Sequence, residues 1–80
     1  MDDQDILSSI NELAHEEHNL FERSAHGGLN EAEKQRLDSL TVSLDQCWDL
    51  LHQRRARRHA GLDPDDAQVR SPEVVENYVE

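Results

Sequence analysis

The sequence lacks the means to form a disulfide or to span a membrane. Cys47 is the single cysteine among 80 residues, which excludes the internal disulfide on which small secreted domains usually depend. No run approaches the roughly 18 apolar residues of a membrane-spanning helix. Residues 1–10, "MDDQDILSSI", have no basic segment before an apolar run, as a secretion signal would. We therefore expect a cytoplasmic protein that is neither exported by a standard signal nor inserted in a membrane.

The motifs of common catalytic sites are also missing. The chain contains no glycine-rich phosphate loop, no paired cysteines and no acid–base constellation. Cys47 follows an apolar helical pattern, where cysteine behaves as a small hydrophobic residue, and His52 falls off its face. We expect no enzymatic activity, no cofactor and no small-molecule substrate.

One stretch, "HEEH" at residues 15–18, raises the question of a metal site. Glu12 and His15 have the Glu-x-x-His spacing found in carboxylate-bridged metal bundles. Both residues fall on the outer face of the predicted helix, however, and the chain has no second motif of this kind. We favour a solvated surface here and no metal, with a metal-dependent enzyme as the least favoured alternative.

Basic residues are scarce and unevenly placed. Eighteen acidic residues face eight basic ones, for a formal net charge of -10. Residues 30–60 carry six of the basic residues, and four of these are arginines within 54–58, whereas the flanking segments 1–29 and 61–80 are strongly acidic. Because a nucleic-acid surface is normally an unopposed basic patch, this distribution favours pairing of the arginines with the chain's own acids.

Two long helices are predicted from the spacing of the apolar residues. In residues 3–25, one face recurs at alternating steps of four and three: Ile6, Ile10, Leu13, Glu17, Leu20 and Ser24. In residues 31–60, the same steps give Glu33, Leu37, Leu40, Leu44, Cys47, Leu51, Arg54 and Arg58. Asp3 or Asp5 is expected to cap the first helix, and Asn30 with Glu33 has a capping-box pattern for the second.

The adjacent glycines at 27 and 28 predict a tight turn, and therefore an all-α, coiled-coil-like antiparallel hairpin over residues 1–61. A single register places Leu13 opposite Leu44, Ile6 opposite Leu51 and Asp3 opposite Arg54, pairs whose numbers each add up to 57. Glu17 then falls on the helix–helix seam, where it is expected to reach Arg36 and help to fix the register.

This register predicts the surroundings of the four arginines, Arg54, Arg55, Arg57 and Arg58. They should lie beside the acids at the N-terminus of the first helix and just before the acids of residues 63–66. They also occupy the last turns of the second helix, where cations interact favourably with the helix dipole. We favour intramolecular pairing, and the alternatives are a polyanion such as RNA or DNA and an acidic protein partner.

A second apolar stripe, which runs beside the first, predicts self-association. Leu7, Ala14 and Phe21 are spaced by seven in the first helix, and Trp48 and Leu50 flank the seam of the second. A two-helix hairpin covers one seam and not two. We expect a second copy to cover the stripe in a four-helix bundle, and the alternative is a monomer whose C-terminal tail covers it.

Residues 62–80 are predicted to form an acidic tail with short helical turns near 64–68 and 72–78. Asp63-Pro64 and Ser71-Pro72 each offer a cap followed by proline, and Gly61 suits the end of the second helix. Four apolar residues form one face of the second turn: Val74, Val75, Tyr78 and Val79. Because helices this short are unstable alone, the tail must dock on the hairpin or on a partner.

The segments "EEHNLFER", "LDQCWDLLHQRRARR" and "GLDPDDAQVR" resemble a small actinobacterial family known only as a domain of unknown function. The resemblance covers nearly the whole chain, and residues 44–58 are its most distinctive part. It implies a cytoplasmic actinobacterial protein, and it brings no activity, cofactor or catalytic residue.

Two functional hypotheses follow. The first is a non-enzymatic helical interaction module that self-associates and offers Phe21, Trp48 and the four arginines to partners. The second is a nucleic-acid-associated regulator that uses the basic cluster of residues 52–59. Salt-dependent retention on RNA or DNA discriminates between them, because phosphate contacts weaken steeply with salt.

Overall fold

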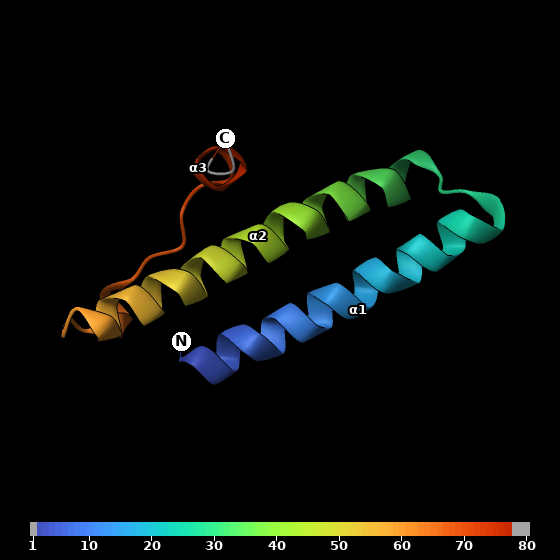
Figure 1. Ribbon diagram of the computed structural model, residues 1–80. Coiled ribbons are helices and arrows are strands. Elements are labelled where there is room, and N and C mark those ends of the chain that lie inside the picture. Colours follow the sequence, from blue (N-terminus) through green and yellow to red (C-terminus); the bar gives the residue numbers. More distant parts are fainter. Residues whose placement is uncertain (1, 78–80) are drawn as a thin grey trace.

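The computed structural model describes residues 2–77 and consists of two long helices and a C-terminal arm. Helix α1 spans Asp3–Gly27, α2 spans Glu31–His59, a 3-10 turn η1 spans Pro64–Asp66, and α3 spans Pro72–Asn77. The two long helices run antiparallel, so the N-terminus lies beside the C-terminal end of α2 (Figure 1). The predicted all-α hairpin with short C-terminal turns is confirmed.

Capping boxes mark the start of both long helices. The Asn30 side chain accepts a hydrogen bond from the backbone N–H of Glu33 at 2.8 Å, and Glu33 accepts one from the backbone N–H of Asn30 at 3.1 Å. In α1 the cap is Asp2, paired reciprocally with Asp5. The prediction of Asp3 or Asp5 as the cap was wrong, because Asp2 alone stands three residues before an acid whose carboxylate can complete the box.

Glycine is required at both helix ends. Gly28 and Gly61 have φ of 77° and 75°, in the left-handed region that disfavours a Cβ atom. After α2, the N–H of Leu62 donates to the carbonyl of Arg57 at 2.8 Å and the N–H of Gly61 to that of Arg58 at 3.1 Å. This is a Schellman motif, which satisfies the last carbonyls of α2 and turns the chain back along it.

The core follows the predicted seam. Ile6, Leu40 and Leu51 are fully buried. Ile6, Ile10, Leu44, Leu50 and Leu51 form one cluster, against which Leu13, Ala14, Cys47 and Ala67 pack. At the open end of the hairpin, Arg54 Nε lies 2.6 Å from Asp3 Oδ1, which is the predicted register.

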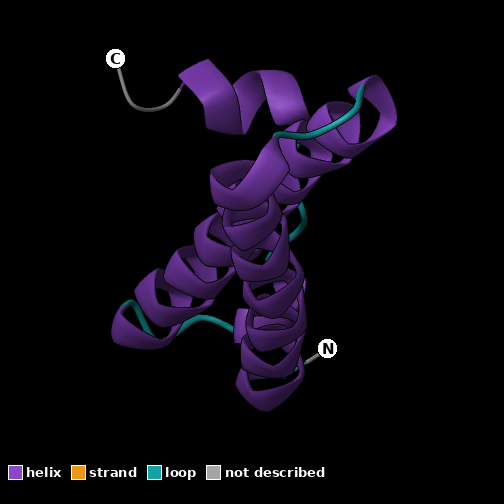
Figure 2. Ribbon diagram, turned by 90° about the vertical axis from the view of Figure 1, so that its right-hand side faces the viewer, coloured by secondary structure: helices purple, strands orange, loops and turns teal. Residues whose placement is uncertain are grey.

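The C-terminal arm, residues 62–77, packs along α2: η1 and α3 both contact α2, and neither contacts α1. Val75 of α3 is buried, and α3 crosses α2 (Figure 2). The side-chain amides of Gln46 and Gln53 donate to the backbone carbonyls of Arg70 and Gln68 at 2.9 and 2.8 Å. Val74 is exposed, so it does not share the buried face predicted for it with Val75, and Tyr78 and Val79 lie outside the described residues.

The resulting molecule is elongated. Its extents are 50 × 26 × 17 Å and its radius of gyration is 14.8 Å, whereas a compact chain of this length has about 12 Å. Its accessible surface is 5653 Å², about 700 Å² more than the roughly 4,900 Å² of a compact monomer of this mass. The two-helix layer therefore leaves an unusually large area exposed to solvent.

Candidate interaction surfaces

Three arginines at the end of α2 bind the chain's own acids in a cluster that we call the arginine junction: Arg54, Arg57 and Arg58 with the carboxylates of Asp3, Asp65 and Asp66 and the backbone carbonyls of Asp63 and Pro64. The sequence folds this way because the register puts the start of α1 beside the end of α2, and the Schellman turn brings residues 63–66 back onto the same end. The arginine-rich segment therefore pairs with acidic residues that lie both before it and after it in the sequence.

Arg54 lies at the centre of this junction, with only 8% of its side chain exposed. Besides the contact to Asp3, its Nη1 donates to Asp65 Oδ1 at 2.9 Å and to the backbone carbonyl of Pro64 at 3.3 Å. A guanidinium suits this position because its planar fork serves several acceptors at once. Arg54 therefore ties together α1, α2 and the arm.

The other arginines differ in what they contact. Arg58 donates to both carboxylate oxygens of Asp3, at 3.2 and 2.5 Å. Arg57 Nε donates to the Asp63 carbonyl at 2.6 Å, and its Nη2 lies 3.5 Å from Asp66. Arg55 is exposed and forms no ion pair with any residue in the range 2–77. The prediction that the arginines pair within the chain is thus confirmed for three of the four.

The junction perturbs one acid strongly. Hydrogen bonds from Arg58, and then from Arg54, lower the pKa of Asp3 from 3.8 to about 2. A carboxylate stabilised in this way stays ionised throughout the physiological range. Its role is electrostatic, because a general acid or base would need a pKa near the working pH.

A shallow cavity of about 220 Å³ opens beside the junction and is lined by Arg55, Arg58 and His59. It lies at the C-terminal end of α2, where the helix dipole opposes anions. Arg58 is already engaged by Asp3. The cavity is therefore a poor anion site despite its basic lining.

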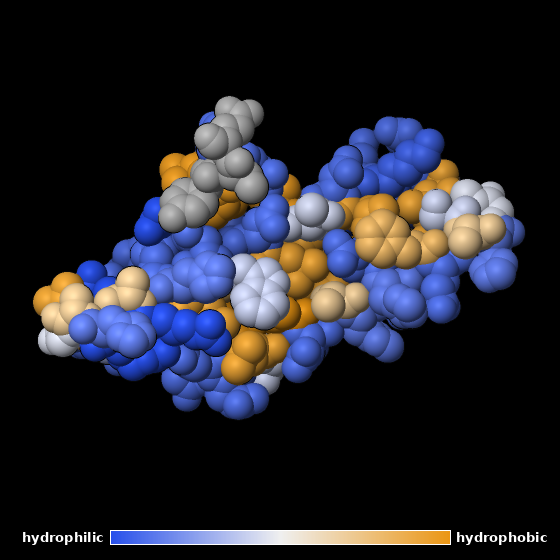
Figure 3. Space-filling model, viewed as in Figure 1, coloured by the Kyte–Doolittle hydropathy of each residue, from blue (hydrophilic) through white to orange (hydrophobic). Residues whose placement is uncertain are grey.

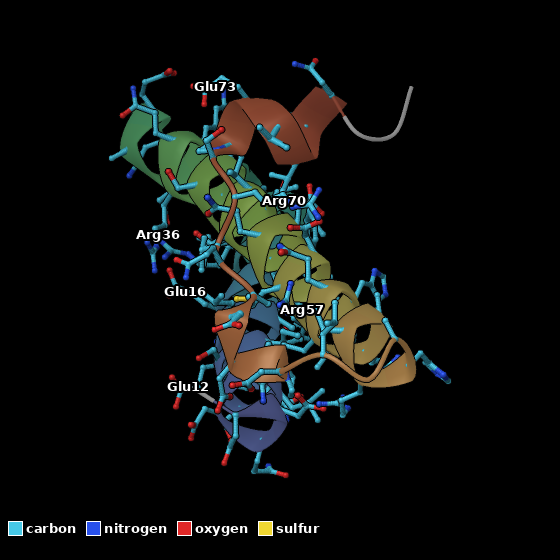
Figure 4. All side chains as sticks on the ribbon, turned by 90° about the vertical axis from the view of Figure 1, so that its left-hand side faces the viewer. Glu12, Glu16, Arg36, Arg57, Arg70 and Glu73 are labelled. Atoms are coloured by element: carbon cyan, nitrogen blue, oxygen red, sulfur yellow. The ribbon has the colours of Figure 1, made fainter. Side chains whose placement is uncertain are left out.

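Two contacts across the hairpin define its two sides. On one side, Arg36 of α2 forms a bidentate pair with Glu16 of α1, with Nη2 at 2.8 Å from Oε1 (Figure 4). On the other side, the Thr41 hydroxyl donates to Glu17 at 3.4 Å. The predicted contact of Glu17 with Arg36 was wrong. Consecutive side chains on a helix point in directions about 100° apart, and it is Glu16 that lies on the Arg36 side.

The arm occupies the Arg36 side. Leu50 lies four turns after Arg36 and is buried in the cluster that includes Ala67 of the arm. Arg70 Nε reaches Asp49 at 3.3 Å on the same region of α2. Leu50, predicted to belong to the second stripe, is thus covered within the chain.

The Glu17–Thr41 side remains uncovered and carries the apolar face, which we define as Leu7, Ala14, Phe21 and Trp48. Phe21 follows Glu17 by one turn, and Trp48 follows Thr41 by two turns. Leu7, Phe21 and Trp48 are 36, 53 and 42% exposed. Figure 3 shows apolar surface along the line where α1 and α2 meet. These exposed side chains are not covered by the arm as far as residue 77, and the rest of the tail that was considered as an alternative cover, Tyr78 and Val79, lies outside the described residues.

The residues considered for chemistry lie apart. Glu12 is exposed (Figure 4), as is His15, and His18 pairs with Glu22 at 3.2 Å. Within residues 2–77 no three His, Cys, Asp or Glu side chains converge on a position that could hold a metal ion. Cys47 is half-buried against the core cluster, and burial raises the pKa of its thiol, which disfavours the reactive thiolate.

Sequence reasoning missed the clasp between the arm and α2. It consists of Gln46, Asp49 and Gln53, spaced along one side of α2, with the backbone and Arg70 of the arm. The signal available in the sequence was the i, i+3, i+7 spacing of three polar residues, which also fits an ordinary solvated face.

Among the described helices, none is long and apolar enough to cross a membrane.

Fold and surfaces together define a small helical hairpin with a docked C-terminal arm and one open apolar face. The chain belongs to the family described as Protein of unknown function (DUF2630), whose model matches residues 2–80. The predicted resemblance to an actinobacterial family of unknown function is thereby confirmed.

Mycobacterial proteins are among the relatives. The chain is 47% identical over 77 residues to "Uncharacterized protein Rv0898c" of Mycobacterium tuberculosis (strain ATCC 25618 / H37Rv). The alignment covers 95% of this chain and 88% of that protein. The same values hold for "Uncharacterized protein Mb0922c" of Mycobacterium bovis. No solved structure matches the chain.

Proposed function

We propose that the protein is a small, non-enzymatic helical interaction module that self-associates through its apolar face. The observation that carries this proposal is the exposure of Leu7, Phe21 and Trp48 on one side of the hairpin, while the arm fills the opposite side. Large apolar side chains gathered on one face of a small soluble protein mark an interaction site, and aromatic side chains dominate the energetics of such sites.

The available area supports this proposal. A stable interface buries about 800 Å² on each partner. The surface of the elongated chain exceeds that of a compact monomer of its mass by about 700 Å², which is similar in size. A second copy on the apolar face would complete the four-helix bundle that the two-helix layer lacks.

A protein partner is favoured over nucleic acid by the state of the arginine junction. Arg54, Arg57 and Arg58 already bind carboxylates, so a phosphate would have to displace these contacts. The net charge of -10 adds long-range repulsion of a polyanion.

Sedimentation equilibrium of the full chain at micromolar concentration tests the proposal. We expect a mass of twice the 9.2 kDa of one chain. The double variant Phe21→Gln/Trp48→Gln should dissociate while it keeps its helicity. Val69→Gln is the matched control, because Val69 is 60% exposed but lies on the arm, and it should leave the mass unchanged. A mass of 9.2 kDa at every concentration, or association unaffected by the double variant, would refute the proposal.

A further inference from the structure

The apolar positions of α1 are symmetric along the helix, which determines how a second copy fits. Leu7 and Phe21 are large and exposed, and they flank the small Ala14 at equal distances of seven residues. Two antiparallel copies of α1 with Ala14 on Ala14 therefore place each Phe21 on Leu7 of the second copy. Because the two small Ala14 side chains face each other at the centre, the helices can approach closely, and the large side chains fill the space on either side.

The hairpin register extends this symmetry to α2. Asp3 pairs with Arg54, so the same register puts Ala14 level with Ser43. A twofold axis through that level carries Trp48, five residues after Ser43, to the level of residue 38 on the second copy. Trp48 then meets the neighbouring Leu37, which is half-buried at the seam. One axis thus gives both exposed aromatic side chains an apolar neighbour.

Charge also favours the antiparallel arrangement over the parallel one. The open end of the hairpin, residues 1–5 with 52–66, carries six acids and four arginines, whereas the turn end, residues 20–36, carries three acids and three basic residues. A parallel dimer would bring two net-negative ends together, and an antiparallel dimer brings each negative end to a neutral one. Like charges held close across an interface are unfavourable.

We propose that the occupant of the apolar face is a second copy that packs antiparallel, α1 on α1, across a twofold axis at Ala14. This inference rests on the self-association proposed above and adds its geometry. It places Ala14 of the two copies side by side. It also keeps Leu7 of one copy apart from Trp48 of the other, whereas a parallel dimer would bring these two residues together.

Disulfide trapping in the full chain tests this geometry. In a Cys47→Ser background, Ala14→Cys should form a covalent dimer with glutathione disulfide as oxidant, because its Cα atoms would lie near the 4.4–6.8 Å span of a disulfide. Asn19→Cys is the control, since Asn19 is exposed on the opposite side of α1. We expect Ala14→Cys to cross-link at least about tenfold faster, since its thiols are held together within the dimer. The mixture of Leu7→Cys and Phe21→Cys chains is a second pair that should also cross-link.

The outcomes separate this inference from the proposed function. If sedimentation gives a dimer but Ala14→Cys cross-links no faster than Asn19→Cys, the antiparallel geometry is wrong and self-association stands. Rapid cross-linking between Leu7→Cys and Trp48→Cys chains would also overturn it, in favour of a parallel dimer. A monomeric mass would overturn both.

Discussion

Arg54→Met is the substitution that tests the arginine junction most sharply. Methionine keeps much of the length of the buried stem and removes the guanidinium that binds Asp3, Asp65 and the Pro64 carbonyl. Hydrogen bonds to charged groups contribute about 1.5–3 kcal/mol each. The full sum does not apply, because Asp3 keeps its two hydrogen bonds from Arg58 and Asp65, 74% exposed, can bind water instead.

We therefore expect a loss of about 2 kcal/mol, most of it from the 2.6 Å contact to Asp3. Urea unfolding followed by circular dichroism measures this loss as a shift of the midpoint. With a slope of about 1 kcal/mol per molar urea, the midpoint should fall by about 2 M. Protein concentration must be held fixed, because self-association raises apparent stability.

Arg55→Met is the matched control, since Arg55 is exposed and unpaired among residues 2–77. It should change the free energy of unfolding by less than about 0.5 kcal/mol. Equal midpoints for the two variants would refute the assignment of Arg54 as the residue that joins α1, α2 and the arm.

Three further predictions concern the core and the acids. Leu40→Ala should cost about 2–5 kcal/mol, because Leu40 is fully buried, whereas Leu7→Ala, on the open face, should cost far less in the dissociated chain. Asp3→Asn should flatten the acid limb of the stability curve: the depressed pKa of Asp3, about 2, stabilises the fold above pH 4 and ceases to do so as pH falls toward 2. The pKa of Glu76 is raised by its hydrogen bond with Asp45, so docking of α3 should strengthen as pH falls toward the acidic range, and Asp45→Asn should remove this dependence.

Each of these predictions has a distinct contradicting result. Equal unfolding midpoints for Leu40→Ala and Leu7→Ala would contradict the placement of the core. An acid limb in Asp3→Asn as steep as in the unchanged chain would show that Asp3 does not carry it. Hydrogen exchange of the α3 amides reports docking, and exchange that slows equally at low pH with and without Asp45 would contradict the carboxyl pair.

The hairpin could be predicted from the sequence because each of its determinants is local or periodic. The four-three spacing from Ile6 to Leu20 and from Leu37 to Leu51 gives both helices, and the adjacent glycines give the turn. The register followed because only one alignment matched both apolar seams and also set Asp3 against Arg54, as observed.

The course of the arm could not be predicted in the same way. Its contacts are amide side chains of Gln46 and Gln53 donating to backbone carbonyls, and such contacts leave no apolar period in the sequence. From the sequence, the arm was expected either to cover the whole second stripe or to leave all of it exposed. It covers Leu50 and leaves Trp48 open, because these two residues lie on opposite sides of the seam.

The fluorescence of Trp48 tests the central claim most directly. It is the single tryptophan of the chain, it lies on the apolar face, and 42% of it is exposed in one copy. If a second copy covers this face, dilution from micromolar to nanomolar concentration should shift its emission to longer wavelength as the indole becomes hydrated. Phe21→Gln should move the midpoint of this transition to higher concentration. An emission maximum that stays constant on dilution, while sedimentation reports a dimer that dissociates over the same range, would show that the copies associate through another surface and would contradict the account.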